Sequence, residues 1–171
     1  ECGLPKERTF VTGSPMAEVL HANLDKIEAS DVHQRLGLTK GQYILLSAHR
    51  EENIDTDRNF VQLFTAVNAM AEKYDMPILY SCHPRSRKRL EATGFHLDSR
   101  VIAHEPLGFH DYNCLQMNAF AVVSDSGTLP EESSFFLSVG KPFPAISIRT
   151  STERPEALDA GCFILAGIDA E

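Results

Sequence analysis

The fold is decided by the stretch Phe120-Ala121-Val122-Val123-Ser124-Asp125-Ser126-Gly127-Thr128-Leu129-Pro130-Glu131-Glu132. Its first five residues are apolar or small, as in a strand that is buried on both faces. A short turn containing Gly127 follows, and Pro130 stands where the first turn of a helix would begin. A buried strand that leads through a glycine turn into a helix is typical of α/β folds with parallel sheets.

The same alternation continues on both sides of this stretch. Short apolar runs predict strands at Thr9–Thr12, Tyr43–Ser47, Ile78–Cys82, Val101–His104, Phe120–Ser124, Ala145–Ile148 and Cys162–Ala166. Helical periodicity between them predicts helices at Pro15–Glu28, Asp57–Tyr74, Pro84–Ala92, His110–Asn118, Leu129–Ser138 and Arg154–Ala160. The expected fold is therefore α/β, a Rossmann-like, doubly wound parallel sheet with right-handed crossovers.

Length and composition fit one globular domain over residues 1–171, with 43% hydrophobic and 23% charged residues. The net charge of −8 disfavours nucleic-acid and anionic-membrane binding. No apolar run approaches the roughly 20 residues of a membrane span, and the scattered cysteines favour a reducing, cytoplasmic setting. The chain begins without methionine and stops directly after a strand-like run, so we expect a fragment of a longer polypeptide.

Polar clusters follow several of the predicted strands. Because the carboxyl ends of parallel strands share one edge of the sheet, these clusters should meet where ligands bind in such folds. The clusters are Ala48-His49-Arg50-Glu51-Glu52-Asn53, His83-Pro84-Arg85, Glu105-Pro106, Asp125-Ser126-Gly127-Thr128 and Arg149-Thr150-Ser151-Thr152-Glu153-Arg154-Pro155. Their common position predicts a binding edge.

The turn at Ser126-Gly127 lies at the start of a predicted helix, where free N–H groups and the positive helix end suit a phosphate. Glu132 is placed to accept hydrogen bonds from ribose hydroxyls, whereas Glu131 fits a capping box with Thr128 and is expected to be structural.

Basic side chains could complete the anion site, although each could also be an ordinary surface residue. His49, Arg50 and Arg154 offer donors to phosphate oxygens, and His83 could serve as a ligand or cap the next helix. No catalytic triad, paired metal ligands or Walker-type loop is visible. The residues alone therefore predict a nucleotide- or phosphosugar-binding half-site that needs a partner domain.

The strings Ser47–Asn53, Ser124–Glu132 and Thr152–Ala157 resemble the non-hydrolysing UDP-N-acetylglucosamine 2-epimerase family. The resemblance implies a two-domain GT-B fold, of which this chain is most of the C-terminal, UDP-binding half. The N-terminal domain, which carries the acid-base carboxylates in this family, and the last helices would be absent.

The resemblance also implies residue roles. His49 would contact the diphosphate leaving group, Ser126 and Gly127 would form the phosphate turn, and Arg154 would reach the nucleotide phosphates. Glu132 would hold the ribose. The remaining implied contacts are Tyr112 against uracil, the backbone at Leu107 on the uracil edge, and a possible allosteric site at Arg50 and His83.

The implied reaction inverts C2 of a UDP-N-acetylhexosamine by elimination and re-addition of UDP, without a metal or other cofactor. The resemblance implies UDP and UDP-N-acetylhexosamine as ligands, a homodimeric full-length protein in the cytoplasm, and a role in polysaccharide synthesis. The isolated fragment should be inactive. Two alternatives share the same site: a UDP-sugar-dependent GT-B glycosyltransferase domain and a non-catalytic nucleotide-sugar sensor.

Three features depart from the commonest family pattern: Glu51 in place of an arginine, Thr128 in place of the second turn glycine, and a longer stretch at Ser133–Val139. They bear on allosteric control and on the sugar. The His-Arg-Glu-Glu-Asn and Ser-Gly-Thr variants look more like the branch acting on UDP-N-acetyl-6-deoxyhexosamines, in the pathway to UDP-N-acetyl-L-fucosamine.

Overall fold

A computed structural model describes residues 5–8, 10, 12–50, 53 and 56–167. Its centre is a six-stranded, entirely parallel sheet in the order β3-β2-β1-β4-β5-β6. The strands are β1 (Ile44–Ser47), β2 (Ile78–Ser81), β3 (Val101–His104), β4 (Ala121–Ser124), β5 (Ala145–Ser147) and β6 (Ile164–Leu165). The chain moves outward from β1 to β3 and then returns to place β4 beside β1. The strand order therefore reverses between β1 and β4, which is where ligands bind in doubly wound sheets.

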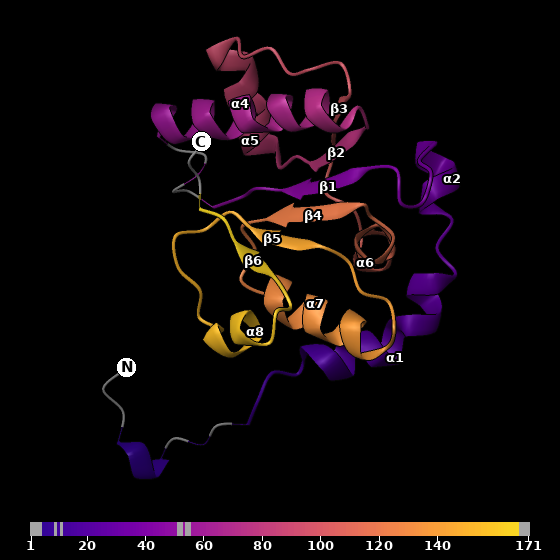
Figure 1. Ribbon diagram of the computed structural model, residues 1–171, viewed down its shortest axis with the longest axis vertical. Helices are drawn as coiled ribbons and strands as arrows, with labels where there is room; N and C mark the ends of the chain where they lie inside the picture. Colours follow the sequence, from indigo (N-terminus) through magenta and orange to yellow (C-terminus); the bar gives the residue numbers. More distant parts are fainter. Residues whose placement is uncertain (1–4, 9, 11, 51–52, 54–55, 168–171) are drawn as a thin grey trace.

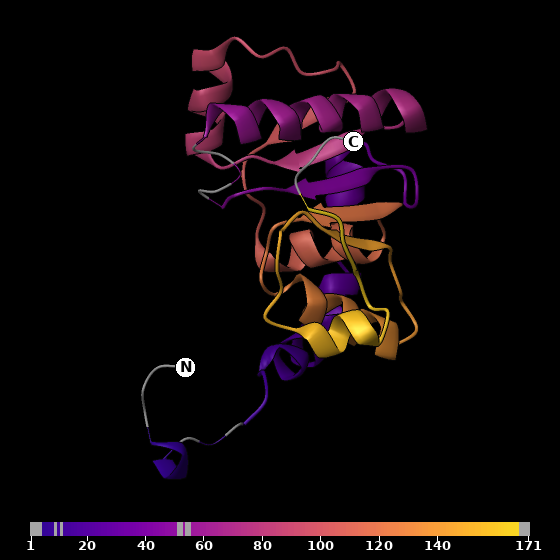
Figure 2. The ribbon, with the colours of Figure 1, turned by 60° about the vertical axis from the view of Figure 1, so that its left-hand side comes forward.

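Helices cover both faces of the sheet (Figure 1). One face carries α4 (Asp57–Tyr74) and α5 (Pro84–Thr93), and the other carries α1 (Met16–Glu28), α6 (Phe109–Met117), α7 (Leu129–Ser138) and α8 (Pro155–Asp159). The short α2 (Val32–Leu36) packs beside α6, and a 3-10 turn, η1 (Lys6–Arg8), lies away from the sheet in both views (Figures 1 and 2).

Alternating side chains of β1 pack into two separate hydrophobic cores, one on each face of the sheet. Leu45 packs into the cluster with α1, α6 and α7, whereas Ile44 and Leu46 pack into the cluster with α4. This division follows from the two-residue period of a strand, which sends successive side chains to opposite faces. All residues of β1, β2 and β4 are buried, as continuous apolar runs predict.

The carboxyl ends of four strands form a level row of serines. Ser47 of β1 is in register with Ser81 of β2 and with Ser124 of β4, which is in register with Ser147 of β5. All four are buried. Shortly after β2 and β4 the chain turns into α5 and α7, each with a proline in its first turn. The amino ends of these two helices therefore follow the row directly, whereas α8 begins farther along the chain, at Pro155.

The expected α/β fold is confirmed, and the predicted helix Asp57–Tyr74 has the observed bounds. The strand expected at Thr9–Thr12 is wrong: Phe10 and Thr12 are not in a strand, and Phe10 is 83% exposed, while Thr9 and Val11 lie outside the described residues. The sequence analysis missed α2. No helix in the described part of the chain is long and apolar enough to cross a membrane.

Candidate functional site

One buried carboxylate ties together the loops that follow β1 and β4. Asp125 is 1% exposed, and its Oδ1 and Oδ2 accept the backbone N–H of His49 at 3.1 and 2.9 Å. Its Oδ2 also accepts the backbone N–H of Arg50 and the Nδ2 of Asn53, both at 2.9 Å. These bonds fix the loop carrying His49 against the turn after β4. The sequence analysis gave Asp125 no role, although an acidic residue directly after a buried strand was a usable signal.

His49 lies at the exposed rim of this edge, next to His83 at the end of β2. The two rings meet edge to face with centroids 6.3 Å apart. Desolvation by the surrounding protein lowers the pKa of His49; Asp125 opposes this shift, and His83 adds to it. His83 also accepts the backbone N–H of Arg85 at 3.3 Å, so it caps α5, as one of its two sequence interpretations predicted.

The turn Ser126-Gly127 lies at the amino end of α7, between two guanidinium groups. A Cβ atom built on Gly127 would lie 3.7 Å from Nη2 of Arg50 and 3.9 Å from Nη1 of Arg149. Arg50 is held there because its Nε donates to the carbonyl of Asp125 at 2.9 Å. An anion at this turn would meet a positive helix end and two arginines.

Arg149 is the functional candidate that the sequence analysis missed. It follows β5 and is only 6% exposed, and its Nη1 and Nη2 donate to the two carboxylate oxygens of Glu153 at 2.7 Å each. The hydrogen bond from Arg149 is the main cause that lowers the pKa of Glu153 to about 2. The usable signal was a basic residue directly after an apolar strand; Arg154, farther along, was chosen instead.

Gly127→Ala is expected to leave the fold intact and to weaken anion binding. The new methyl group would be in ordinary contact with both guanidinium groups, so the free energy of unfolding should change by less than about 1 kcal/mol. The same methyl group would occupy space above the turn, and overpacking of this kind costs about 1–3 kcal/mol, or roughly fivefold to 150-fold in the affinity for a diphosphate. Urea unfolding and calorimetric titration measure the two effects. Equal diphosphate affinity of the variant and the parent would show that an anion does not bind at this turn.

Glu132 is held by side chains from two helices. Its Oε1 accepts the hydroxyl of Thr128 at 2.8 Å, and its Oε2 accepts Nε2 of the fully buried Gln116 at 2.7 Å. The predicted capping box between Thr128 and Glu131 is therefore wrong, because Thr128 pairs one residue farther along. The carboxylate of Glu132 is oriented by neighbours before any ligand arrives.

The two residues expected near uracil lie in α6 and in the loop before it. Tyr112 and Leu107 both pack against the core cluster shared with α1 and α7. Burial, followed by the Glu132 carboxylate, raises the pKa of Tyr112, while hydrogen bonds with Ser47 and Ser124 oppose the shift. Tyr112 thus reaches the ends of β1 and β4, and its contact with uracil stays a prediction.

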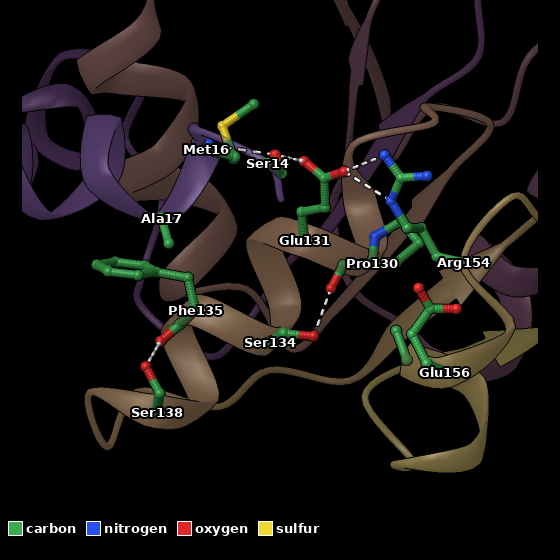
Figure 3. Close-up of a pocket in the computed structure, with 11 residues that line it drawn as sticks. Ser14, Met16, Ala17, Pro130, Glu131, Ser134, Phe135, Ser138, Arg154 and Glu156 are labelled. Atoms are coloured by element: carbon green, nitrogen blue, oxygen red, sulfur yellow. Dashed lines mark hydrogen bonds and ion pairs between the residues drawn. The ribbon is translucent and has the colours of Figure 1, made fainter. Parts of the chain in front are cut away.

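Arg154 is not one of the two guanidinium groups within 4 Å of a Cβ built on Gly127; it pairs with Glu131 in the first turn of α7. Its Nε and Nη2 donate to Oε1 of Glu131 at 2.8 and 2.7 Å, and Oε2 of Glu131 accepts the hydroxyl of Ser14 at 2.5 Å (Figure 3). Burial alone would raise the pKa of Glu131, but the bonds from Ser14 and Arg154 and the charge of Arg154 lower it overall. These three residues line a cavity of about 360 Å³ between α1, α7 and α8.

Among the described residues, no group of three or more His, Cys, Asp or Glu side chains is placed to hold a metal ion. Glu51, the residue that departs from the usual arginine, lies outside the described residues. Thr128 is described and bonds to Ser126 Oγ at 2.9 Å, so this departure adds a hydroxyl to the turn.

A doubly wound parallel sheet with a glycine turn and basic side chains where the strand order reverses defines the class of Rossmann-like α/β domains. Within that class, the sequence model of the family described as UDP-N-acetylglucosamine 2-epimerase matches residues 1–171, and the chain belongs to this family.

Relatives agree with this assignment. The UDP-N-acetylglucosamine 2-epimerase of Methanococcus maripaludis is 33% identical, over 99% of this chain and 47% of its own length. The structure of UDP-N-acetylglucosamine 2-epimerase from Rickettsia bellii is 39% identical with a TM-score of 0.83, over 99% of this chain and 43% of that one. The structure of the Methanocaldococcus jannaschii UDP-GlcNAc 2-epimerase in complex with UDP-GlcNAc and UDP is 29% identical, with a TM-score of 0.84. The match covers 98% of this chain and 46% of that one. The chain spans about half the length of the relatives it matches.

Proposed function

We propose that this chain is the UDP-binding domain of a UDP-N-acetylhexosamine 2-epimerase. The observation that carries the proposal is the Gly127 turn, which lies at the start of α7 between the guanidinium groups of Arg50 and Arg149. A diphosphate needs such a concentration of donors and positive charge. The complex of the Methanocaldococcus jannaschii relative with UDP-GlcNAc and UDP supports the same ligand class.

In this proposal the diphosphate lies over Ser126 and Gly127, with His49 donating from the β1 loop. Arg154, which is paired with Glu131 in the first turn of α7, reaches the diphosphate from the α8 side. Glu132 accepts the ribose hydroxyls, and the uracil lies toward Leu107 and Tyr112. Desolvation lowers the pKa of His49, which favours the neutral imidazole in the absence of ligand, and a neutral imidazole can still donate one hydrogen bond to a diphosphate oxygen.

The proposed reaction explains why this domain would place several hydrogen-bond donors at the diphosphate leaving group. The C2 hydrogen of the sugar is not next to a carbonyl, so simple deprotonation is too difficult. UDP instead leaves across C1–C2 to give a glycal and then adds back with the proton on the opposite face. Each preorganised donor at the diphosphate can lower this barrier by about 3 kcal/mol. The other half of the protein supplies the acid and base, so we expect the isolated chain to be inactive.

The remaining features of the proposal concern the whole protein. We propose a homodimer in the cytoplasm that takes UDP-N-acetylhexosamine as substrate and binds a regulatory UDP-sugar near Arg50 and His83. Free thiols at Cys82, Cys114 and Cys162 are compatible with a reducing compartment.

Incubation of the full-length protein with UDP-N-acetylglucosamine in heavy water tests the reaction. We expect deuterium at C2 of both epimers, measured by NMR, because the proton is removed and replaced from solvent. A glycosyltransferase would instead move the sugar to an acceptor without exchange at C2. A sensor would bind the UDP-sugar and leave C2 unlabelled. Either of these outcomes would overturn the proposal.

A further inference from the structure

We infer that Glu131 is a positioning residue that orients Arg154 toward the diphosphate and links it to the segment leading into α1. This inference rests on the proposed function, since it assigns a task to Arg154 at the same site. It concerns a carboxylate that the sequence analysis expected to cap its own helix, a task that Glu131 does not perform.

The contacts of Arg154 determine which of its donors a ligand can use. Glu131 takes Nε and one N–H of Nη2, and the carbonyl of Glu153 takes one N–H of Nη1 at 3.1 Å. Each terminal nitrogen of an arginine carries two N–H groups, so one on Nη1 and one on Nη2 have no partner among the described residues. Glu131 thus holds one edge of the guanidinium and leaves one donor on each terminal nitrogen for phosphate oxygens.

Burial makes Glu131 the fixed member of the pair. The side chain of Glu131 is 16% exposed, whereas that of Arg154 is 42% exposed. A long, half-exposed arginine loses substantial rotamer freedom when it binds a ligand, and a fixed carboxylate removes part of that loss in advance. Arg154 is therefore held in one orientation before the nucleotide arrives.

Ser14 connects the same carboxylate to the chain that enters α1. Its hydroxyl donates to Oε2 of Glu131, and its Oγ accepts the backbone N–H of Met16 at 3.2 Å, in the first turn of α1. Ser14, Glu131 and Arg154 also line a second cavity of about 550 Å³ with Phe10, Thr12, Gly13 and Glu156. A movement of the segment before α1 would therefore reach Arg154 through a single carboxylate.

The test compares two charge-removing variants of the full-length protein, Glu131→Gln and Glu156→Gln, by calorimetric titration with UDP. Glu156 lines both cavities but forms no hydrogen bond or ion pair with Arg154 among the described residues, so it is a matched control. Removing a negative charge near an anion should by itself tighten binding. We expect Glu131→Gln to weaken UDP binding about fivefold to tenfold, and Glu156→Gln to leave it equal or tighter.

Two further variants keep the inference falsifiable if Glu131→Gln folds poorly. Ser14→Ala removes the bond to Oε2 of Glu131 and the bond from the Met16 N–H, and it should weaken UDP binding about twofold. In an Arg154→Ala background, Glu131→Gln should cause no further weakening and leave UDP binding equal or tighter. Tighter UDP binding by Glu131→Gln, or an undiminished effect in the Arg154→Ala background, would overturn the positioning role. Absence of UDP binding by the unmodified protein would instead contradict the proposed function.

Discussion

Asp125→Asn should lower the free energy of unfolding by about 3 kcal/mol or more and weaken UDP binding about 100-fold. The buried carboxylate accepts hydrogen bonds from His49, Arg50 and Asn53. An asparagine offers one oxygen where the carboxylate offers two, and its NH₂ group would face a backbone N–H. The β1 loop would then separate from the Gly127 turn, and the donors on the two sides of the diphosphate would no longer be held together.

Urea unfolding and UDP titration of the full-length protein measure both effects. Asp159→Asn is the matched control, because Asp159 is exposed in the short α8 and makes no side-chain hydrogen bond among the described residues. The control should unfold and bind UDP as the parent does. If Asp125→Asn loses stability but keeps its UDP affinity, the β1 loop is not part of the diphosphate site.

Glu132→Gln is expected to weaken UDP binding about tenfold to 100-fold. The substitution keeps the shape of the side chain, and its amide oxygen can still accept from Gln116, so the fold should remain. What is lost is the negative charge, which makes hydrogen bonds from ribose hydroxyls roughly twice as strong.

A change on the ligand isolates this contact. UDP lacking both ribose hydroxyls should bind the parent and Glu132→Gln with similar, weak affinity. Without those hydroxyls, neither protein can form hydrogen bonds between residue 132 and the ribose. If Glu132→Gln weakens binding of the deoxygenated ligand as much as it weakens binding of UDP, Glu132 does not act through the ribose hydroxyls.

Most of the fold could be predicted because its central strands are covered on both faces. The uninterrupted apolar runs of β1, β2 and β4 admit few other interpretations, and the long α4 shows its buried stripe over five turns. The predicted strand at Thr9–Thr12 was wrong because a strand needs a partner, and pairing is decided by residues far away in the sequence. The five-residue α2 was too short to show a period; its signal was Gly37, whose φ of 65° ends the helix.

The meeting of the loops after β1 and β4 at one edge of the sheet could also be predicted, but the pairing of the side chains there could not. Topology alone brings His49 and Gly127 to one edge. Glu131 and Glu132 differ by one position along α7, so they face different neighbours. Glu132 meets Gln116 of α6, and Glu131 meets Ser14, which lies 117 positions earlier in the sequence. Such choices depend on how helices distant in the chain pack together, which local patterns do not encode.

The row of serines at the ends of β1, β2, β4 and β5 places four small, buried side chains next to one another where the sheet ends. The backbone hydrogen bonding continues past this row, since the Asp125 N–H donates to the carbonyl of Ser47 at 3.1 Å. Threonine or valine at any of these positions would add atoms to a packed interior, and overpacking of this kind costs about 1–3 kcal/mol. Attempts to reshape the binding edge should therefore begin in the loops after the strands and keep these four residues small.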